Sequence, residues 1–233
     1  MFFLDYFATG KLDGEQFKVV LNSLKKSLAQ VNCPLVGGET AELPGLYEKG
    51  HFDMAGFVVG IAEKSRMPDF SRVEKDHVLL AIPSSGFHSN GYSLLRKWVQ
   101  EFPDLQHPDM INYLLTPTRI YDFVEGLYHQ ENAAIIAMSH ITGGGFDENI
   151  PRILPDHLAA KINLSQLKIP TKMQEVFSIA QHKISDLTRV FNLGVGMVLV
   201  CKESGIDVIT AQVPDAYVLG KVVERQDQAV VYG

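Results

Sequence analysis

The sequence predicts an α/β protein in two parts, a small strand–helix–strand block followed by a larger α/β sandwich with a mixed sheet. Short apolar runs of strand length interleave with amphipathic helical stretches. Their alternation is not strict, which favours a mixed sheet over an all-parallel one. A polar stretch that ends in Pro68-Asp69 separates the two parts, so we place a boundary near residue 66.

The first block opens with an apolar, aromatic strand over 2–7, and Asp13 with Gln16 then forms a capping pair that begins a helix. We expect a glycine-rich loop over 36–47 and a strand over 54–62, whose glycines indicate close contact with a neighbour. A block of about 65 residues buries only a small core, so it is expected to depend on more chain or on a partner. The apolar face of the helix consists of Phe17, Val20, Leu21, Leu24, Leu28 and Val31.

The second block carries clear helix signals. After a strand over 78–82, apolar residues at helical spacing predict a helix over 92–102. Thr116 and Pro117 form an N-cap and N1 pair, which predicts a helix running on through Leu127. A further helix is expected over 175–181. The other expected strands cover 133–138, 158–162, 197–201, 217–223 and 229–232.

The composition excludes several classes of protein. The 233 residues are 46% apolar and 21% charged, as in a folded chain, and the apolar runs are far shorter than the roughly 20 residues of a membrane helix. A net charge of −6 gives no general attraction for nucleic acid. Cys33 and Cys201 lack the spacing of a zinc site and are expected to be reduced. No signal peptide is recognisable, so we expect a cytoplasmic protein.

Four glycine-bearing segments stand out, over 36–42, 84–91, 142–145 and 192–196. The second follows a strand and opens a helix, so its backbone N–H groups and the hydroxyls of Ser85 and Ser89 could converge on a phosphate. A capping turn explains the same residues about equally well, and a tight turn is the commoner use of three glycines. No Gly-Lys-Ser/Thr follows, and the fourth segment leads into a strand, which argues against a P-loop and a dinucleotide fingerprint.

Carboxylates and histidines lie beside these segments. Asp5, Glu39, Glu42 and Asp53 offer the oxygen ligands that suit Mg²⁺ with nucleotide phosphates, although a solvated turn is the commoner meaning of such residues. His88 and His140 flank glycine-rich loops, where a neutral imidazole could act as a base or hydrogen-bond a phosphate. A structural polar role is at least as frequent for either histidine.

Six segments in the same order resemble the phosphoribosylformylglycinamidine cyclo-ligase family, also called aminoimidazole ribonucleotide synthetases. The resemblance implies ATP-dependent cyclisation of formylglycinamidine ribonucleotide to aminoimidazole ribonucleotide, with release of ADP and phosphate, in purine biosynthesis. It also implies Mg²⁺ as cofactor, this phosphorylated ribonucleotide and ATP as ligands, and a homodimer for the full-length form. The segments are FFLDYFATGKL at 2–12, GGETAE at 37–42, HSNGYSL at 88–94, TPTRIY at 116–121, TGGGF at 142–146, and FNLGVGM at 191–197.

The resemblance also implies roles for individual residues. Glu39 and His88 would be catalytic, and Asp5 and Glu39 would bind the metal. The nucleotide side would consist of Asp5, Gly37, Gly38, Glu39 and Glu42. The substrate side would consist of Ser85, Ser89, Asn90, Thr142, Gly143, Gly144 and Asn192, in the same cleft between the two domains.

The chain departs from the family at its start. Family members carry a further N-terminal segment with a Thr-Asp-Gly-Val-Gly-Thr-Lys loop, so the resemblance implies an N-terminally truncated chain. Residues 1–65 would then be the remainder of an N-terminal ATP-binding and dimerisation domain, and residues 66–233 the C-terminal domain. Two alternatives stay open: a catalytically inactive fragment that binds a ribonucleotide or a partner, and a related ATP-dependent enzyme acting on another amide or acid.

Overall fold

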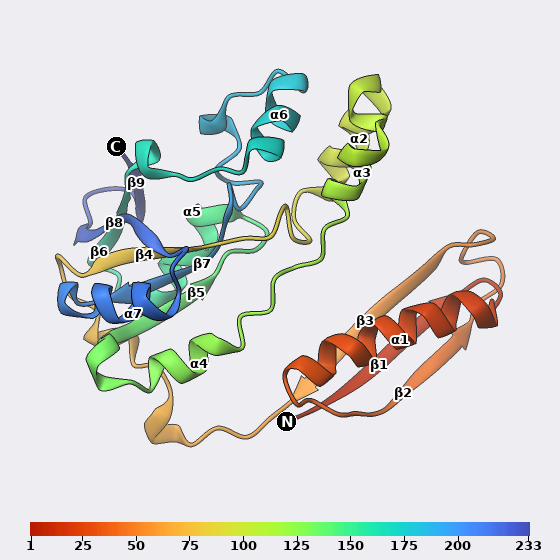
Figure 1. Ribbon diagram of the computed structural model, residues 1–233, viewed down its shortest axis with the longest axis horizontal. Coiled ribbons are helices and arrows are strands. Elements are labelled where there is room, and N and C mark those ends of the chain that lie inside the picture. The colour runs from red at the N-terminus through yellow and green to blue at the C-terminus, as the bar shows by residue number, and fades with distance from the viewer. The chain divides into compact units, whose positions relative to one another are not determined.

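The computed structural model describes every residue from Met1 to Gly233. The chain divides into two units, Met1–Met67 and Pro68–Gly233. The first unit holds a three-stranded sheet and the second a six-stranded sheet (Figure 1). None of the helices is both long and apolar enough to cross a membrane.

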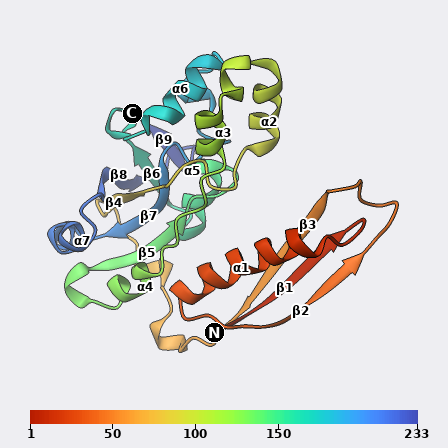
Figure 2. The same ribbon diagram turned by 45° about the vertical axis from the view of Figure 1, so that its right-hand side comes forward.

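The first unit is a small sheet with one helix. Its strands run in the order β2-β1-β3, with β1 parallel to β2 and antiparallel to β3. The helix lies along the sheet (Figure 2), and its Phe17 ring meets the Phe7 ring edge-on at 5.1 Å. The predicted cap is confirmed, because the Asp13 carboxylate accepts the N–H groups of Glu15 and Gln16. The elements are β1 (Phe2–Thr9), α1 (Gly14–Gln30), β2 (Leu35–Glu42) and β3 (Phe52–Val59).

The loop predicted over 36–47 is wrong, because residues Leu35–Glu42 form the strand β2. Glycine at position 38 allows the neighbouring strand to approach closely, because a Cβ on Gly38 would lie 2.0 Å from Oδ1 of Asp5 on that strand. Glycine in a strand marks such close approach as well as a turn. Turn geometry begins only at Gly45, whose φ is +88°.

The second unit is built on a mixed sheet, as the sequence predicts. Its strands run in the order β5-β7-β4-β8-β6-β9, and every neighbouring pair is antiparallel except β6 and β9. The central strand β4 is buried on both faces, which explains its continuous apolar sequence. The strands are β4 (Val78–Pro83), β5 (Ile135–His140), β6 (Leu158–Ile162), β7 (Val195–Cys201), β8 (Tyr217–Glu224) and β9 (Val230–Tyr232).

Helices cover both faces of this sheet (Figure 1). On one face Leu79 belongs to a core cluster with Trp98 of α2, and on the other Leu80 belongs to a cluster with Val124 of α4 and Ile209 of α7. Successive residues of a strand point to opposite faces, so β4 contributes to both cores. The helices are α2 (Tyr92–Glu101), α3 (Pro108–Leu114), α4 (Phe123–Tyr128), α5 (Gly145–Asn149), α6 (Thr171–Ile179) and α7 (Ile206–Gln212).

The helix predicted to start at Thr116 is wrong, because α4 begins only at Phe123. Residues 116–122 instead form an irregular segment, which we call the strap. The side chains of Arg119 and Tyr121 both bond to the carbonyl oxygen of Pro83, at 3.2 and 2.9 Å. These tertiary bonds hold the strap against the end of β4, so the local N-cap signal is overridden.

Candidate functional site

Three of the predicted glycine-bearing segments meet at one edge of the six-stranded sheet. The strands β4 and β5 end at this edge and β7 begins there, since Pro83 lies opposite Val195 and His140 opposite Met197. The segments 84–91, 141–145 and 192–194 therefore lie beside one another. We call this region the loop edge.

Asn192 ties the first and third of these segments together. Its side chain is 0% exposed, and its Nδ2 donates to the carbonyl oxygen of Gly86 at 2.9 Å. Its Oδ1 accepts the N–H of Gly194 at 3.0 Å, while the N–H of Ser84 donates to the carbonyl oxygen of Gly194. Asn192 thus supports the loop edge through backbone groups, and its contact with a substrate stays a prediction.

Asn149 organises the three glycines, and the sequence analysis did not assign it to the site. Its buried Nδ2 donates to the carbonyl oxygens of Thr142, Gly143 and Gly145, and its Oδ1 accepts the Thr142 hydroxyl at 3.0 Å. A Cβ on Gly145 would lie 1.8 Å from the carbonyl oxygen of Thr188. The run of glycines is therefore a packing requirement here as well as an open stretch of backbone.

The predicted residues of the first segment divide between the surface and the interior. Ser85 and Ser89 are exposed, and the Ser85 hydroxyl donates to the carbonyl oxygen of Pro117 in the strap at 2.6 Å. Asn90 is 8% exposed, and its Oδ1 lies 4.0 Å from the position of a Cβ on Gly143. The structure therefore brings the predicted substrate segments 85–90 and 142–144 together.

His88 is the buried histidine of the loop edge. It is 4% exposed, and its φ of +56° is in the left-handed region that side chains other than glycine rarely adopt. Its Nε2 accepts the N–H of Ser85 at 3.1 Å and the N–H of Arg119 at 3.4 Å, while its Nδ1 has no partner. Burial, with smaller contributions from His140 and Arg119, lowers the pKa of His88 to about 4. The ring is therefore neutral at pH 7.

Tyr121 and His140 complete a group of three rings around His88. The ring centroids of His88 lie 6.2 Å from those of Tyr121 and of His140, and burial raises the pKa of Tyr121 and lowers that of His140. Gly196 makes this approach possible, because its Cβ would lie 1.7 Å from the Tyr121 hydroxyl oxygen and 2.8 Å from Cε1 of His88. Arg119, Tyr121 and Gly196 occur in the motif segments, but their spacing did not single them out as site residues.

The predicted nucleotide and metal residues lie on the sheet of the first unit. Asp5 pairs with Gly38, Tyr6 with Glu39 and Thr9 with Glu42. Paired residues of neighbouring strands point to the same face and successive residues alternate, so Asp5 and Glu42 point to one face and Glu39 to the other. Glu42 accepts the N–H of Leu12 at 2.7 Å through its Oε1.

The resemblance implied that Asp5 and Glu39 bind the metal, and the strand register places these two side chains on opposite faces of the sheet. The chain also has no group of three or more histidine, cysteine, aspartate or glutamate side chains arranged to hold a metal ion. Metal binding by Asp5 or Glu39 therefore stays a prediction.

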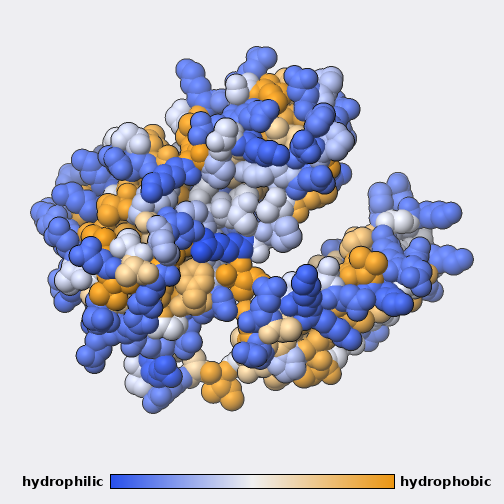
Figure 3. Space-filling model, viewed as in Figure 1, coloured by the Kyte–Doolittle hydropathy of each residue, from blue (hydrophilic) through white to orange (hydrophobic).

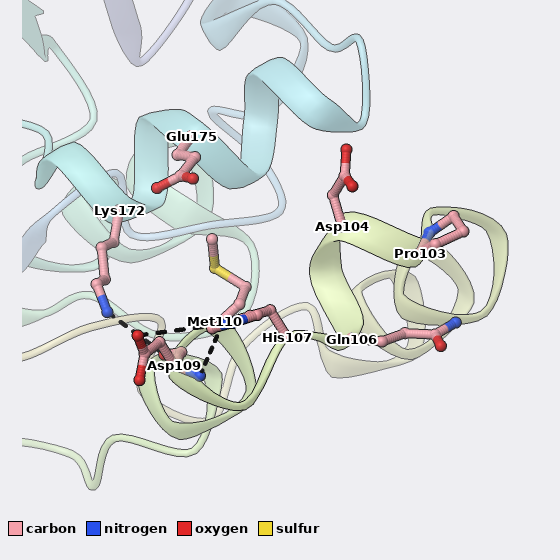
Figure 4. A pocket seen from close by; sticks show the side chains of 8 residues that line it. All are labelled: Pro103, Asp104, Gln106, His107, Asp109, Met110, Lys172 and Glu175. Carbon is pink, nitrogen blue, oxygen red and sulfur yellow. Dashed lines mark hydrogen bonds and ion pairs between the residues drawn. The ribbon is translucent and has the colours of Figure 1, made fainter.

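A groove of about 600 Å³ lies elsewhere in the second unit (Figure 4). The N–H of Asp109 donates to Nδ1 of His107, and Lys172 of α6 reaches the carbonyl oxygen of Asp109 at 3.4 Å. None of the predicted site residues lines it. Its lining consists of Pro103, Asp104, Gln106, His107, Asp109, Met110, Lys172 and Glu175.

Comparison with known proteins covers both units. Residues 1–62 match the N-terminal domain and residues 74–233 the C-terminal domain of the AIR synthase related proteins. A phosphoribosylformylglycinamidine cyclo-ligase of Thermoanaerobacter sp. (strain X514) is 41% identical over 243 residues, which cover 99% of this chain and 72% of the relative.

Solved structures share the fold at low identity. The hydrogenase maturation protein HypE in complex with ATP superposes with a TM-score of 0.71 at 16% identity, over 99% of this chain and 69% of that chain. Thiamine monophosphate kinase of Aquifex aeolicus has a TM-score of 0.68 at 16% identity, over 99% and 72%. By its two matched domains and its identity with the curated relative, the chain belongs to the AIR synthase related family, among the phosphoribosylformylglycinamidine cyclo-ligases.

Proposed function

We propose that this chain is an ATP-dependent cyclo-ligase that converts formylglycinamidine ribonucleotide to aminoimidazole ribonucleotide in purine biosynthesis. The observation that carries the proposal is the 41% identity with a cyclo-ligase over 99% of the chain. The structural neighbours under 25% identity support the fold alone, so the choice of reaction rests on the sequence relative.

The chemistry requires activation of a poor leaving group. The formyl oxygen of the substrate attacks the γ-phosphorus of ATP and ADP leaves, which gives an imino phosphate. The amidine nitrogen that bears the ribose then attacks the formyl carbon, the carbon–oxygen bond breaks, and phosphate departs. The formamide nitrogen loses its proton on phosphorylation and the attacking nitrogen loses its proton on ring closure, and a proton then moves from the methylene carbon to the exocyclic imine nitrogen, which becomes the amino group of the aromatic ring. Because closure is intramolecular, positioning and exclusion of water are the main tasks of the protein.

The loop edge offers groups for a phosphorylated ribonucleotide. The exposed hydroxyls of Ser85 and Ser89 lie just before α2, whose N-terminus at Gly91 has no capping side chain. Free backbone N–H groups at the start of a helix attract a phosphate. We assign Ser85, Ser89, Asn90 and the backbone of 142–144 to the substrate, and His88 to its reacting end.

The first unit is proposed to bind ATP. Gly38 leaves room for the Asp5 carboxylate beside β2, and the ATP complex of HypE is consistent with a nucleotide site in this fold. Mg²⁺ fits only if phosphates and water supply most of its ligands, because Asp5 and Glu39 each offer one carboxylate on separate faces. Bound in that way, the ion would neutralise phosphate charge.

The sheet of the first unit is also proposed to form a homodimer contact, in a cytoplasmic enzyme. Hydrophobic groups are visible on the surface of this unit (Figure 3), and Phe57 and Val59 of the strand β3, which point to the same face of the sheet, are 60% and 44% exposed. Apolar side chains that neighbour one another on a surface mark interaction sites. Sedimentation of the chain tests this assignment, and a monomer at micromolar concentration contradicts it.

The reaction is tested by incubating the purified chain with ATP, Mg²⁺ and formylglycinamidine ribonucleotide that carries a heavy-oxygen label in its formyl group. We expect ADP release that depends on the ribonucleotide, a product lighter by one water, and the label in the released phosphate. Thiamine monophosphate serves as the control acceptor. A longer form that carries the N-terminal segment of the family is assayed beside the chain, and no activity in either form overturns the proposal.

A further inference from the structure

The strap is bonded to the loop edge at several points. The carbonyl oxygen of Pro83 accepts bonds from Nη1 of Arg119 and from the Tyr121 hydroxyl, at 3.2 and 2.9 Å. From the other side, the Ser85 hydroxyl donates to Pro117 in the strap. The strap and the loop that carries His88 therefore hold each other in one arrangement.

Arg119 is held by groups of the protein through its Nη1. Its Nη1 also donates to Oδ2 of Asp215 at 2.7 Å, and its guanidinium lies 5.5 Å from the ring centroid of Tyr121 and 5.3 Å from that of Phe123. A planar, delocalised cation suits such a paired and stacked position. With its side chain held in this way, the backbone N–H of Arg119 keeps its direction toward His88.

The hydrogen bonds of His88 determine where its proton lies. Its Nε2 faces two N–H donors, from Ser85 and from Arg119, so Nε2 acts as an acceptor. A neutral imidazole carries one N–H, which must then be on Nδ1. This Nδ1 is buried and has no partner in the protein, on a residue with a φ of +56°. An unpaired buried donor and a left-handed backbone are both unfavourable and are typical of functional positions.

The surrounding charges favour the same neutral form. The groups that face His88 are Arg119 and Tyr121 from the strap and His140 from the end of β5, and Asp215 pairs with Arg119 rather than with His88. A second proton on His88 would have to enter at Nε2, directly opposite the two N–H donors. The lowered pKa of about 4 agrees with this geometry.

We propose that the strap fixes His88 as the neutral tautomer with its proton on the buried Nδ1 and with Nε2 held by two backbone N–H groups, so that His88 supports the loop edge as a neutral group and does not act as a proton acceptor. Arg119 and Tyr121 are then positioning residues that act through His88. The inference deepens the proposed function, because it assigns a role at the same site, but the tautomer is measurable without any turnover.

The first test is the nitrogen spectrum of the histidines in the full chain, with His88 identified by the signal that the His88→Asn variant loses. We expect a protonated Nδ1 and an unprotonated Nε2, unchanged between about pH 6 and pH 8. A proton on Nε2, an equal mixture of tautomers, or a titration in this range overturns the proposal whether or not the chain turns over substrate.

The second test is a set of variants. Tyr121→Phe keeps the ring but removes one bond to Pro83, so we expect a mixture of His88 tautomers and a kcat at least fivefold lower with KM within twofold. Tyr128→Phe, on α4, is the matched control and should change neither. An asparagine amide reproduces a donor at Nδ1 and a glutamine amide a group at Nε2, so His88→Asn should retain at least tenfold more activity than His88→Gln. The reverse order, or an unchanged tautomer in Tyr121→Phe, contradicts the proposed roles.

Discussion

Replacement of Gly196 by alanine is the sharpest perturbation of the loop edge. The added Cβ would lie 1.7 Å from the Tyr121 hydroxyl oxygen, 2.6 Å from its Cζ and 2.8 Å from Cε1 of His88. Neither ring is the end of a flexible side chain, so Tyr121 must move away from Pro83. The lost hydrogen bond costs about 1 kcal/mol and overpacking about 1–3 kcal/mol, which gives a destabilisation of about 2–4 kcal/mol.

The assay is urea unfolding of the variant beside its parent, followed by the nitrogen spectrum of His88. For a unit of the size of the second unit, the expected loss of unfolding free energy corresponds to a Tm lower by about 5–15 °C. Gly126→Ala is the matched control, because a Cβ at Gly126 meets nothing within 4 Å and the residue lies in the helix α4. The control should gain up to about 1 kcal/mol. A Gly196→Ala protein as stable as its parent, with an unchanged His88 spectrum, would refute the packing argument.

Three further predictions concern the strand β2, the pH dependence and the carboxylates. Gly38→Ala should destabilise the first unit by about 2 kcal/mol, because its Cβ meets Asp5, whereas Gly37→Ala meets only Leu4 at 3.8 Å and should leave the urea midpoint unchanged. The pKa of His88 in the folded protein lies below its ordinary value of 6.5. As the pH falls from 6.5 toward 4, the unfolded chain binds a proton at His88 that the folded protein does not bind. The contribution of His88 to the stability of the folded state is therefore complete above pH 6.5 and is lost toward pH 4. Between pH 7 and pH 4 the parent should therefore lose about 3 kcal/mol more unfolding free energy than His88→Asn does, and equal losses would contradict the lowered pKa. Asp5→Asn and Glu39→Gln should differ in their effect on the Mg²⁺ concentration needed for half-maximal ADP release; equal, large shifts in both would contradict the assignment of the two side chains to opposite faces.

Local patterns predicted most elements of the fold. The carboxylate of Asp13 caps α1, the apolar spacing after Ser89 produces α2, and the strand expected over 158–162 is β6 without any shift. These signals succeed because the periodicity of a helix or a strand is set by residues a few positions apart. In other elements the ends moved, as where α6 begins at Thr171, and the helices α3 and α7 were not predicted.

The two wrong elements have one cause in common. The glycines of β2 and the Thr116-Pro117 pair are local signals for a turn and a helix start, but each segment is bonded to a distant strand. Pairing with β1 and the bonds to Pro83 decide the outcome, and neither partner is a near neighbour in sequence. Local propensity is a weak preference that such contacts outweigh.

The site shows the same division. The sequence motifs around His88, Thr142 and Asn192 can be recognised in the chain, and they identified the segments that meet at the loop edge. The sequence by itself thus determined the fold class, most elements and the family resemblance. Only the tertiary structure decided that Asp5 and Glu39 point to opposite faces and which nitrogen of His88 faces two N–H donors. Those facts depend on strand register and on contacts between residues far apart in the chain, which spacing along the sequence does not encode.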